Sequence, residues 1–197
     1  MTYYRALPNG TYSWQEYQLV TIRPDDREAI RAWRNAQLTV LRQAAPLTAE
    51  QQTAYFERVV QPLFGQEQPA QLLFSLLHQG ELVGYGGLVH IAWADRRAEV
   101  SFLADPARVA NPATYRTDFL AHLRLLGQVA FTALKFNRLF TETYDLRPAH
   151  VAILEEAGFQ LEGRLRQHVR LEAGTFADSL MHGQLATDYA TAFGVFV

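Results

Sequence analysis

The chain has 197 residues, of which 49% are hydrophobic and 19% are charged, and its formal net charge is -2. This length predicts one domain with a full core over residues 1–197, and the small charge gives no reason to expect nucleic acid or an anionic membrane as partner. The chain has no cysteine, which excludes disulfides, thiolate catalysis and cysteine-based zinc sites. No secretory pattern and no apolar stretch of about 20 residues is found, so a cytoplasmic location is expected.

The first third of the chain is expected to form one strand and two helices. Residues 16–23 alternate as in a strand, and an aspartate of Pro24-Asp25-Asp26 is expected to cap a helix over about 26–37. Thr48 with Gln51 is a capping-box pattern, which predicts a second helix through about Val60. Its expected apolar stripe consists of Tyr55, Phe56 and Val59.

Residues 71–104 predict a meander of three strands, over 71–78, 81–93 and 96–104. Gln79-Gly80 between the first two is a signal for a two-residue turn. Because side chains alternate along a strand, Arg97, Glu99, Ser101 and Leu103 are expected on one face, opposite Ala98, Val100, Phe102 and Ala104. One face therefore carries a carboxylate and a hydroxyl, and the other is apolar.

The rest of the chain, after Ala104, is expected to begin with a loop that contains two prolines and to continue with a helix over 113–134. A strand over 136–144 and a short helix over 147–157, which ends at Gly158, are expected next. Two further strands follow, over 159–171 and 175–184. The order β-α-α-β-β-β-α-β-α-β-β indicates an α+β domain with a mixed sheet. The apolar tail 191–197 is expected to pack on the domain or on the second subunit of a homodimer.

Several short sequence motifs, in this order, resemble those of the GCN5-related N-acetyltransferase (GNAT) superfamily, in the branch of ribosomal-protein and amino-sugar acetyltransferases. They are GYGGL (84–88), RAEVSF (97–102), FNRLF (136–140), AGF (157–159) and EGRLR (162–166). The resemblance implies a GNAT fold, whose central sheet has a V-shaped splay and is flanked by helices. It also implies direct transfer of acetyl from acetyl-CoA to a primary amine of a small molecule (amino sugar or amino acid) or of a protein N-terminus.

The resemblance places the pantetheine of acetyl-CoA on the backbone of Ser101, Phe102 and Leu103. The pyrophosphate would lie on a glycine-rich loop at the start of the next helix, but residues 104–119 contain no glycine and two prolines. The family's helix-capping Asn aligns with Arg147, and the Tyr that often protonates the thiolate aligns with Leu154. Two interpretations follow: the cationic side chains of Arg108, Arg116 and Arg147 replace the missing amides, or the domain is a non-catalytic binding module that has lost CoA. The residues on the substrate side match the family pattern, which favours the first interpretation, an active enzyme.

Glu99 aligns with the residue that serves as the base in relatives, often through a water; the alternative is an ion pair with Arg97 or Arg138. Tyr144 is a candidate replacement for the missing acid. His90 lies next to the polar face of the meander, where it would handle a proton or serve as a structural group.

Glu142 and Tyr144 share one face of their strand, where they would either bind the amine acceptor or form cross-strand pairs. Trp33, Arg34 and Arg42 fall in the region that covers the acceptor pocket in this fold. Trp33 either contacts substrate or packs in the core, and Arg42 would pair with an anionic group of the substrate. The six histidines show no HxH or HxxxH spacing, so no metal site is expected.

Overall fold

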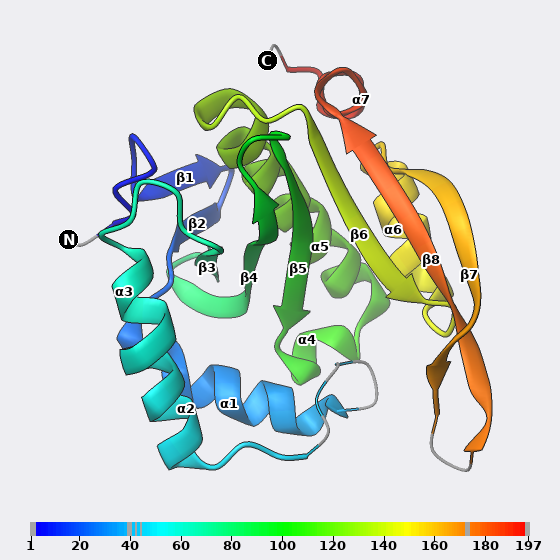
Figure 1. Cartoon of the computed structure of the whole chain (residues 1–197), viewed down its shortest axis with the longest axis horizontal. Helices are drawn as coiled ribbons and strands as arrows, with labels where there is room; N and C mark the ends of the chain where they lie inside the picture. The colour runs from blue at the N-terminus through cyan, green and yellow to red at the C-terminus, as the bar shows by residue number, and fades with distance from the viewer. Residues whose placement is uncertain (1–2, 39–40, 42, 44, 172–173, 196–197) are drawn as a thin grey trace.

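The computed structural model describes residues 3–38, 41, 43, 45–171 and 174–195. Its centre is an eight-stranded sheet in the order β1-β2-β3-β4-β5-β6-β8-β7 (Figure 1). The strands are β1 Thr11–Trp14, β2 Tyr17–Thr21, β3 Leu72–His78, β4 Glu81–Ala92, β5 Arg97–Ala104, β6 Arg138–Tyr144, β7 Gln160–Arg170 and β8 Phe176–Leu185. Neighbouring strands are antiparallel except for the parallel pair β5 and β6. The predicted mixed sheet is confirmed.

Helices cover both faces of this sheet (Figure 1). They are α1 Arg27–Ala36, α2 Ala49–Tyr55, α3 Gln61–Leu63, α4 Pro106–Val109, α5 Pro112–Gly127, α6 Pro148–Glu156 and α7 Ala186–Phe193. The main core joins α5 and α6 to one face, with Phe119, Leu126, Leu139 and Ile153 all buried. A smaller cluster of buried residues lies on the side of α1 and α2 and consists of Ile22, Ile30, Phe56, Val60 and Leu73.

The predicted meander is present as β3, β4 and β5. Its turn residues Gln79 and Gly80 have φ values of 52° and 86°, as a two-residue hairpin turn between twisted strands requires. Strand β4 also runs very close to β5, because a Cβ added at Gly86 would lie 2.1 Å from the carbonyl oxygen of Ser101. Glycine at this position therefore permits the close pairing of the two strands.

The second helix begins as predicted but buries a different stripe. Thr48 and Gln51 form both bonds of the capping box. Phe56 is buried, whereas Tyr55 and Val59 are 37% and 40% exposed, so two of the three stripe residues were predicted wrongly. The reason is a π-helical turn over Phe56–Val60, whose hydrogen bonds span five residues and keep Phe56 and Val60 on one side.

The cap predicted for the first helix is also different. The carboxylate of Asp26 makes no capping bond to α1. It accepts hydrogen bonds from the Arg23 Nε at 2.7 Å and from the Ser75 hydroxyl at 2.5 Å instead. The aspartate thus links the start of α1 to β3 rather than capping the helix.

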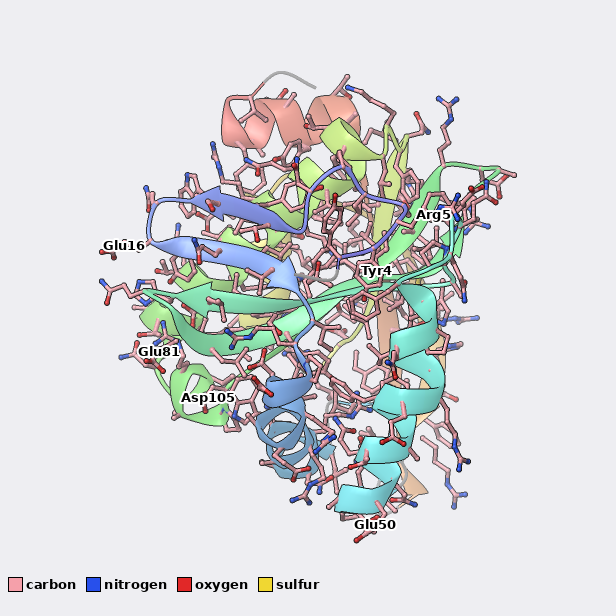
Figure 2. The ribbon with its side chains drawn as sticks, turned by 90° about the vertical axis from the view of Figure 1, so that its left-hand side faces the viewer. Tyr4, Arg5, Glu16, Glu50, Glu81 and Asp105 are labelled. Atoms are coloured by element: carbon pink, nitrogen blue, oxygen red, sulfur yellow. The ribbon has the colours of Figure 1, made fainter. Side chains whose placement is uncertain are left out.

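Two short helices, α4 and α7, were not predicted. Helix α4 forms within the predicted proline loop and follows Asp105, whose side chain accepts the N–H of Ala107 (Figure 2). Helix α7 begins before the predicted tail, includes residues 191–193 of it, and packs on α5, where the buried Tyr189 donates its hydroxyl to the carbonyl of Arg124. In the described part of the chain, no helix is long and apolar enough to cross a membrane.

Candidate active site

Strands β5 and β6 pair over only part of their length. The pairing joins Arg97–Glu99 to Arg138–Phe140, although β5 continues to Ala104 and β6 to Tyr144. The two strands diverge beyond that point (Figure 1). The predicted V-shaped splay is therefore present. Beyond it the two strands no longer form hydrogen bonds with each other, so their facing backbone N–H and C=O groups are not used in a β-ladder.

Glu99 lies where the splay begins and is held by His90. The carboxylate oxygen Oε2 of Glu99 accepts from Nδ1 of His90 at 2.6 Å. The side chain of Glu99 is 13% exposed, whereas that of His90 is 70% exposed. The β4–β5 register shifts between Val89 and Ala92, and this irregularity places His90 beside Glu99. The arrangement provides a shielded carboxylate with a histidine between it and solvent.

Glu142 and Tyr144 lie on the other arm of the splay. Along β6 the buried residues are Leu139, Thr141 and Thr143, so the intervening side chains project from the opposite face. Arg97 lies over the ring of Phe140 at 5.9 Å, which shows that this face is continuous with that of Glu99. Glu142 Oε1 also lies 3.6 Å from Nε2 of His168. The splay thus carries two carboxylates on one face, as the sequence predicts.

A cavity of about 340 Å³ lies between α1, α2 and strands β4 and β5. Ser101, Phe102 and Leu103 line it from β5, and Val89 lines it from β4. Since Val89 is the register partner of Glu99, the cavity reaches the neighbourhood of the carboxylate. Trp33 is half-buried on α1 and is not among the described lining residues. Arg42 lies outside the described residues.

Arg34 and Tyr85 also line this cavity, although sequence reasoning gave no role to Tyr85 and only a location to Arg34. Nη1 of Arg34 donates to the Tyr85 hydroxyl at 2.8 Å, and Nε donates to Oε1 of Gln43 at 2.8 Å. One signal was available: Arg34 follows the buried Ile30 by four residues, so a cation stands at a core-facing position of α1.

The segment after β5 offers no free backbone donor to an anion. Pro106 and Pro112 have no N–H, and the other N–H groups of residues 105–115 all have acceptors. Two side chains accept several of them: Asp105 takes the N–H of Ala107, and Asn111 takes those of Ala113 and Thr114. Backbone carbonyls accept the N–H groups of Asp105, Arg108, Val109, Ala110, Asn111 and Tyr115. The amide cradle that the family uses is therefore absent.

The three arginines proposed as its replacement differ in their surroundings. Arg108 makes two hydrogen bonds to the fully buried Asp118, at 2.5 and 2.8 Å, and Asp118 also accepts from the Tyr17 hydroxyl at 2.7 Å. The bonds to Asp118 raise the pKa of Arg108. Arg116 forms a bidentate ion pair with the exposed Glu156: Nε donates to Oε2 at 2.8 Å, and Nη2 donates to Oε1.

Of these three arginines, Arg147 is the one without an ion pair among the described residues. Its Nη2 donates to the Tyr115 hydroxyl at 3.0 Å, and that hydroxyl lies 2.7 Å from Nδ1 of His150. Burial, followed by the charge of Arg147, lowers the pKa of His150 well below its ordinary value, so its neutral ring accepts the proton of Tyr115. Arg147 therefore sits where α5 and α6 begin, with donor capacity left for an anion.

Two further buried residues come from α5 and α6. Leu154, at the position of the family's acid, is fully buried in the core. His122 is also fully buried and donates from Nε2 to the carbonyl of Ser101 at 3.1 Å. No described residues form a group of three or more His, Cys, Asp or Glu that would hold a metal ion.

Comparison with known proteins agrees with this geometry. The family model of the acetyltransferase (GNAT) domain matches residues 19–181. The structure of spermidine N-acetyltransferase from Vibrio cholerae in complex with CoA and spermine is 19% identical, with 88% of this chain and 98% of that chain covered and a TM-score of 0.75. A dodecameric structure of the Vibrio cholerae enzyme in an intermediate state is 20% identical, with 88% and 96% covered and a TM-score of 0.69. No curated protein matches the chain in sequence.

Proposed function

The chain belongs to the GNAT acetyltransferase family and is an acetyl-CoA-dependent N-acetyltransferase, and we propose that its acceptor is a small primary amine deprotonated by Glu99. The observation that carries this proposal is the adjacency of three features: the splay, the carboxylate of Glu99 and the 340 Å³ cavity. Cavities of this size are typical of small-molecule sites. A protein N-terminus is the less favoured acceptor.

Acetyl-CoA supplies the acetyl group as a thioester, and the chain's residues fit its two ends differently. The open edge of β5 in the splay, at Ser101, Phe102 and Leu103, suits the amide groups of pantetheine. The loop at 105–115 does not suit the pyrophosphate through its backbone. We propose that Arg147, together with Arg116, holds the phosphates through side-chain donors.

A primary amine is mostly protonated at neutral pH and must lose a proton before its nitrogen can act as a nucleophile. Oε of Glu99 would accept that proton at the start of the splay. The N–H of His90 Nδ1 holds the carboxylate in place, and the exposed ring of His90 lies between the carboxylate and solvent. Glu142 and Tyr144 would face the amine from β6. This mechanism needs no covalent acyl-enzyme.

The decisive experiment measures release of the CoA thiol with a panel of small amines, in the wild type and in Glu99→Gln. The amide keeps the shape but cannot accept the proton, so kcat is expected to fall by about 10²- to 10⁴-fold. Glu16→Gln, a change on the turn between β1 and β2, serves as the control and should leave kcat unchanged. Full activity of Glu99→Gln would exclude the role of Glu99.

Calorimetry with acetyl-CoA separates the two interpretations of the loop. Micromolar binding supports the enzyme, whereas no binding at millimolar concentration would favour a module that has lost CoA. Arg108→Glu is unsuitable as a probe, because it would place a second carboxylate against the buried Asp118.

A further inference from the structure

The cavity beside Glu99 is mostly apolar, yet it contains one cation. Most of its described surface is apolar and comes from aliphatic and aromatic side chains; Ile22, Ile30, Leu41, Leu47, Leu73 and Phe56 are examples. Arg34 enters from α1 and Tyr85 from β4, and the two are joined by the 2.8 Å hydrogen bond from Nη1. An apolar wall with a few convergent polar groups is the usual form of a small-molecule site, in which the polar groups set specificity.

Arg34 and Tyr85 keep donor capacity for a ligand. Two of the guanidinium nitrogens of Arg34 are used by Tyr85 and Gln43, and Nη2 has no acceptor among the described residues. The hydroxyl of Tyr85 receives a hydrogen bond from Arg34, which leaves its own proton to donate. Burial raises the pKa of Tyr85, so the hydroxyl stays protonated. Both groups therefore present N–H or O–H donors to the same place.

The charge of the cavity is positive as far as its described lining extends. That lining contains no aspartate or glutamate, and no described carboxylate forms an ion pair with Arg34. A second ammonium group in this cavity would meet the guanidinium and would have no counter-charge, which is costly in an apolar site. A carboxylate would instead complete a charge-assisted, bidentate hydrogen-bonding site.

Glu99 and the pair Arg34–Tyr85 are separated by about four residues of β5. Tyr85 is the register partner of Leu103, and Glu99 lies four residues earlier on the same face of the strand. Four residues of strand span about 13 Å. An amine at Glu99 and an anion at Arg34 thus belong to the two ends of one extended molecule, and an α-amino acid is too short.

From this geometry, and resting on the proposed function, we infer that the acceptor is a primary amine whose apolar chain ends in a carboxylate, which Arg34 and Tyr85 bind. Arg34 is thereby the residue that determines specificity at the far end of the acceptor. A polyamine is the opposite class, because its far end is cationic.

The test uses three amines of equal length: 8-aminooctanoate, octylamine and 1,8-diaminooctane. The kcat/KM for acetylation is expected to be highest for the amino acid, about 10- to 100-fold above octylamine, and lowest for the diamine. In Arg34→Met this preference should disappear. Arg58→Met removes a cation from the exposed side of the neighbouring π-helical turn and should keep it. A diamine preference, or an unchanged order in Arg34→Met, would overturn the inference.

A binding measurement distinguishes failure of this inference from failure of the proposed function. Octanoate has the carboxylate and the chain but no amine, so its affinity does not depend on catalysis. Calorimetry should show binding that Arg34→Met weakens at least tenfold and Arg58→Met does not. If no amine is acetylated but octanoate still binds through Arg34, the proposed function fails and the inferred site stands. If octanoate does not bind the wild type, or binds Arg34→Met equally well, the inferred site is wrong whatever the activity.

Discussion

Two regions border the end of strand β5 and treat their polar groups in opposite ways. On the side proposed for acetyl-CoA, the segment 105–115 uses every available backbone N–H internally, and Arg108 is occupied by the buried Asp118. On the acceptor side, Arg34 and Tyr85 face a cavity with donors to spare. Polar groups satisfied within the fold stabilise it, and those left over are the ones available to a ligand.

This contrast explains how a loop without glycine can follow a GNAT-like strand. The prolines and the caps Asp105 and Asn111 form helix α4 and the start of α5, which makes the segment compact. Compactness removes the amides that would otherwise receive phosphate, so any recognition of phosphate falls to side chains. Arg147, without an ion pair in the described part of the chain, is the best placed of the three arginines.

The largest expected effect comes from breaking the buried ion pair that holds the segment 105–115. Asp118→Asn removes the buried charge that pairs with Arg108 and accepts from Tyr17, and we expect it to lower the free energy of unfolding by about 3 kcal/mol, because it leaves Arg108 without its counter-charge. Urea unfolding measures the change. Arg116→Gln breaks the exposed pair with Glu156 and should cost less than about 1 kcal/mol. Equal losses in the two variants would show that the buried pair does not hold this region together.

A smaller effect is expected on the affinity for acetyl-CoA, whose phosphates Arg147 is proposed to bind. Arg147→Gln removes the cation at the starts of α5 and α6, and the affinity for acetyl-CoA is expected to fall about tenfold, since charge-assisted bonds to phosphate are among the stronger ones. Calorimetry measures it. Arg5→Gln is the matched control, since Arg5 pairs with Glu67 and lies near the end of α3, far along the chain from the splay (Figure 2). Unchanged affinity in Arg147→Gln would remove this residue from the proposed site.

A third effect depends on pH and concerns the buried His122, whose Nε2 donates to the carbonyl of Ser101 on β5. Burial lowers the pKa of His122 from 6.5 to about 3. Between these values the unfolded chain binds a proton that the folded chain does not, so stability falls as the pH falls through this window and is fully present above 6.5. His122→Phe should reduce this slope by up to about 1.4 kcal/mol per pH unit. Unfolding curves at pH 7, 6 and 5 measure it, and parallel dependence in the two proteins would contradict the prediction.

The sequence by itself determined the meander, the splay strands and the order of the main elements. Alternation in residues 97–104 placed Glu99 and Ser101 on one face, and the turn at Gln79-Gly80 fixed the hairpin, because both signals are local. The sequence also shows that the loop after β5 contains no glycine. In the structure, the backbone N–H groups of this loop are all paired within the fold, so none is available to phosphate.

Only the tertiary structure decided which polar groups are left for function. The sequence could not show that Arg108 is consumed by Asp118, that Arg34 meets Tyr85 across 51 positions, or that a π-helical turn moves Val59 outward. These outcomes depend on contacts between segments distant in the chain, and the spacing of residues does not specify such contacts. A site is made of the groups that the fold brings together and does not itself satisfy.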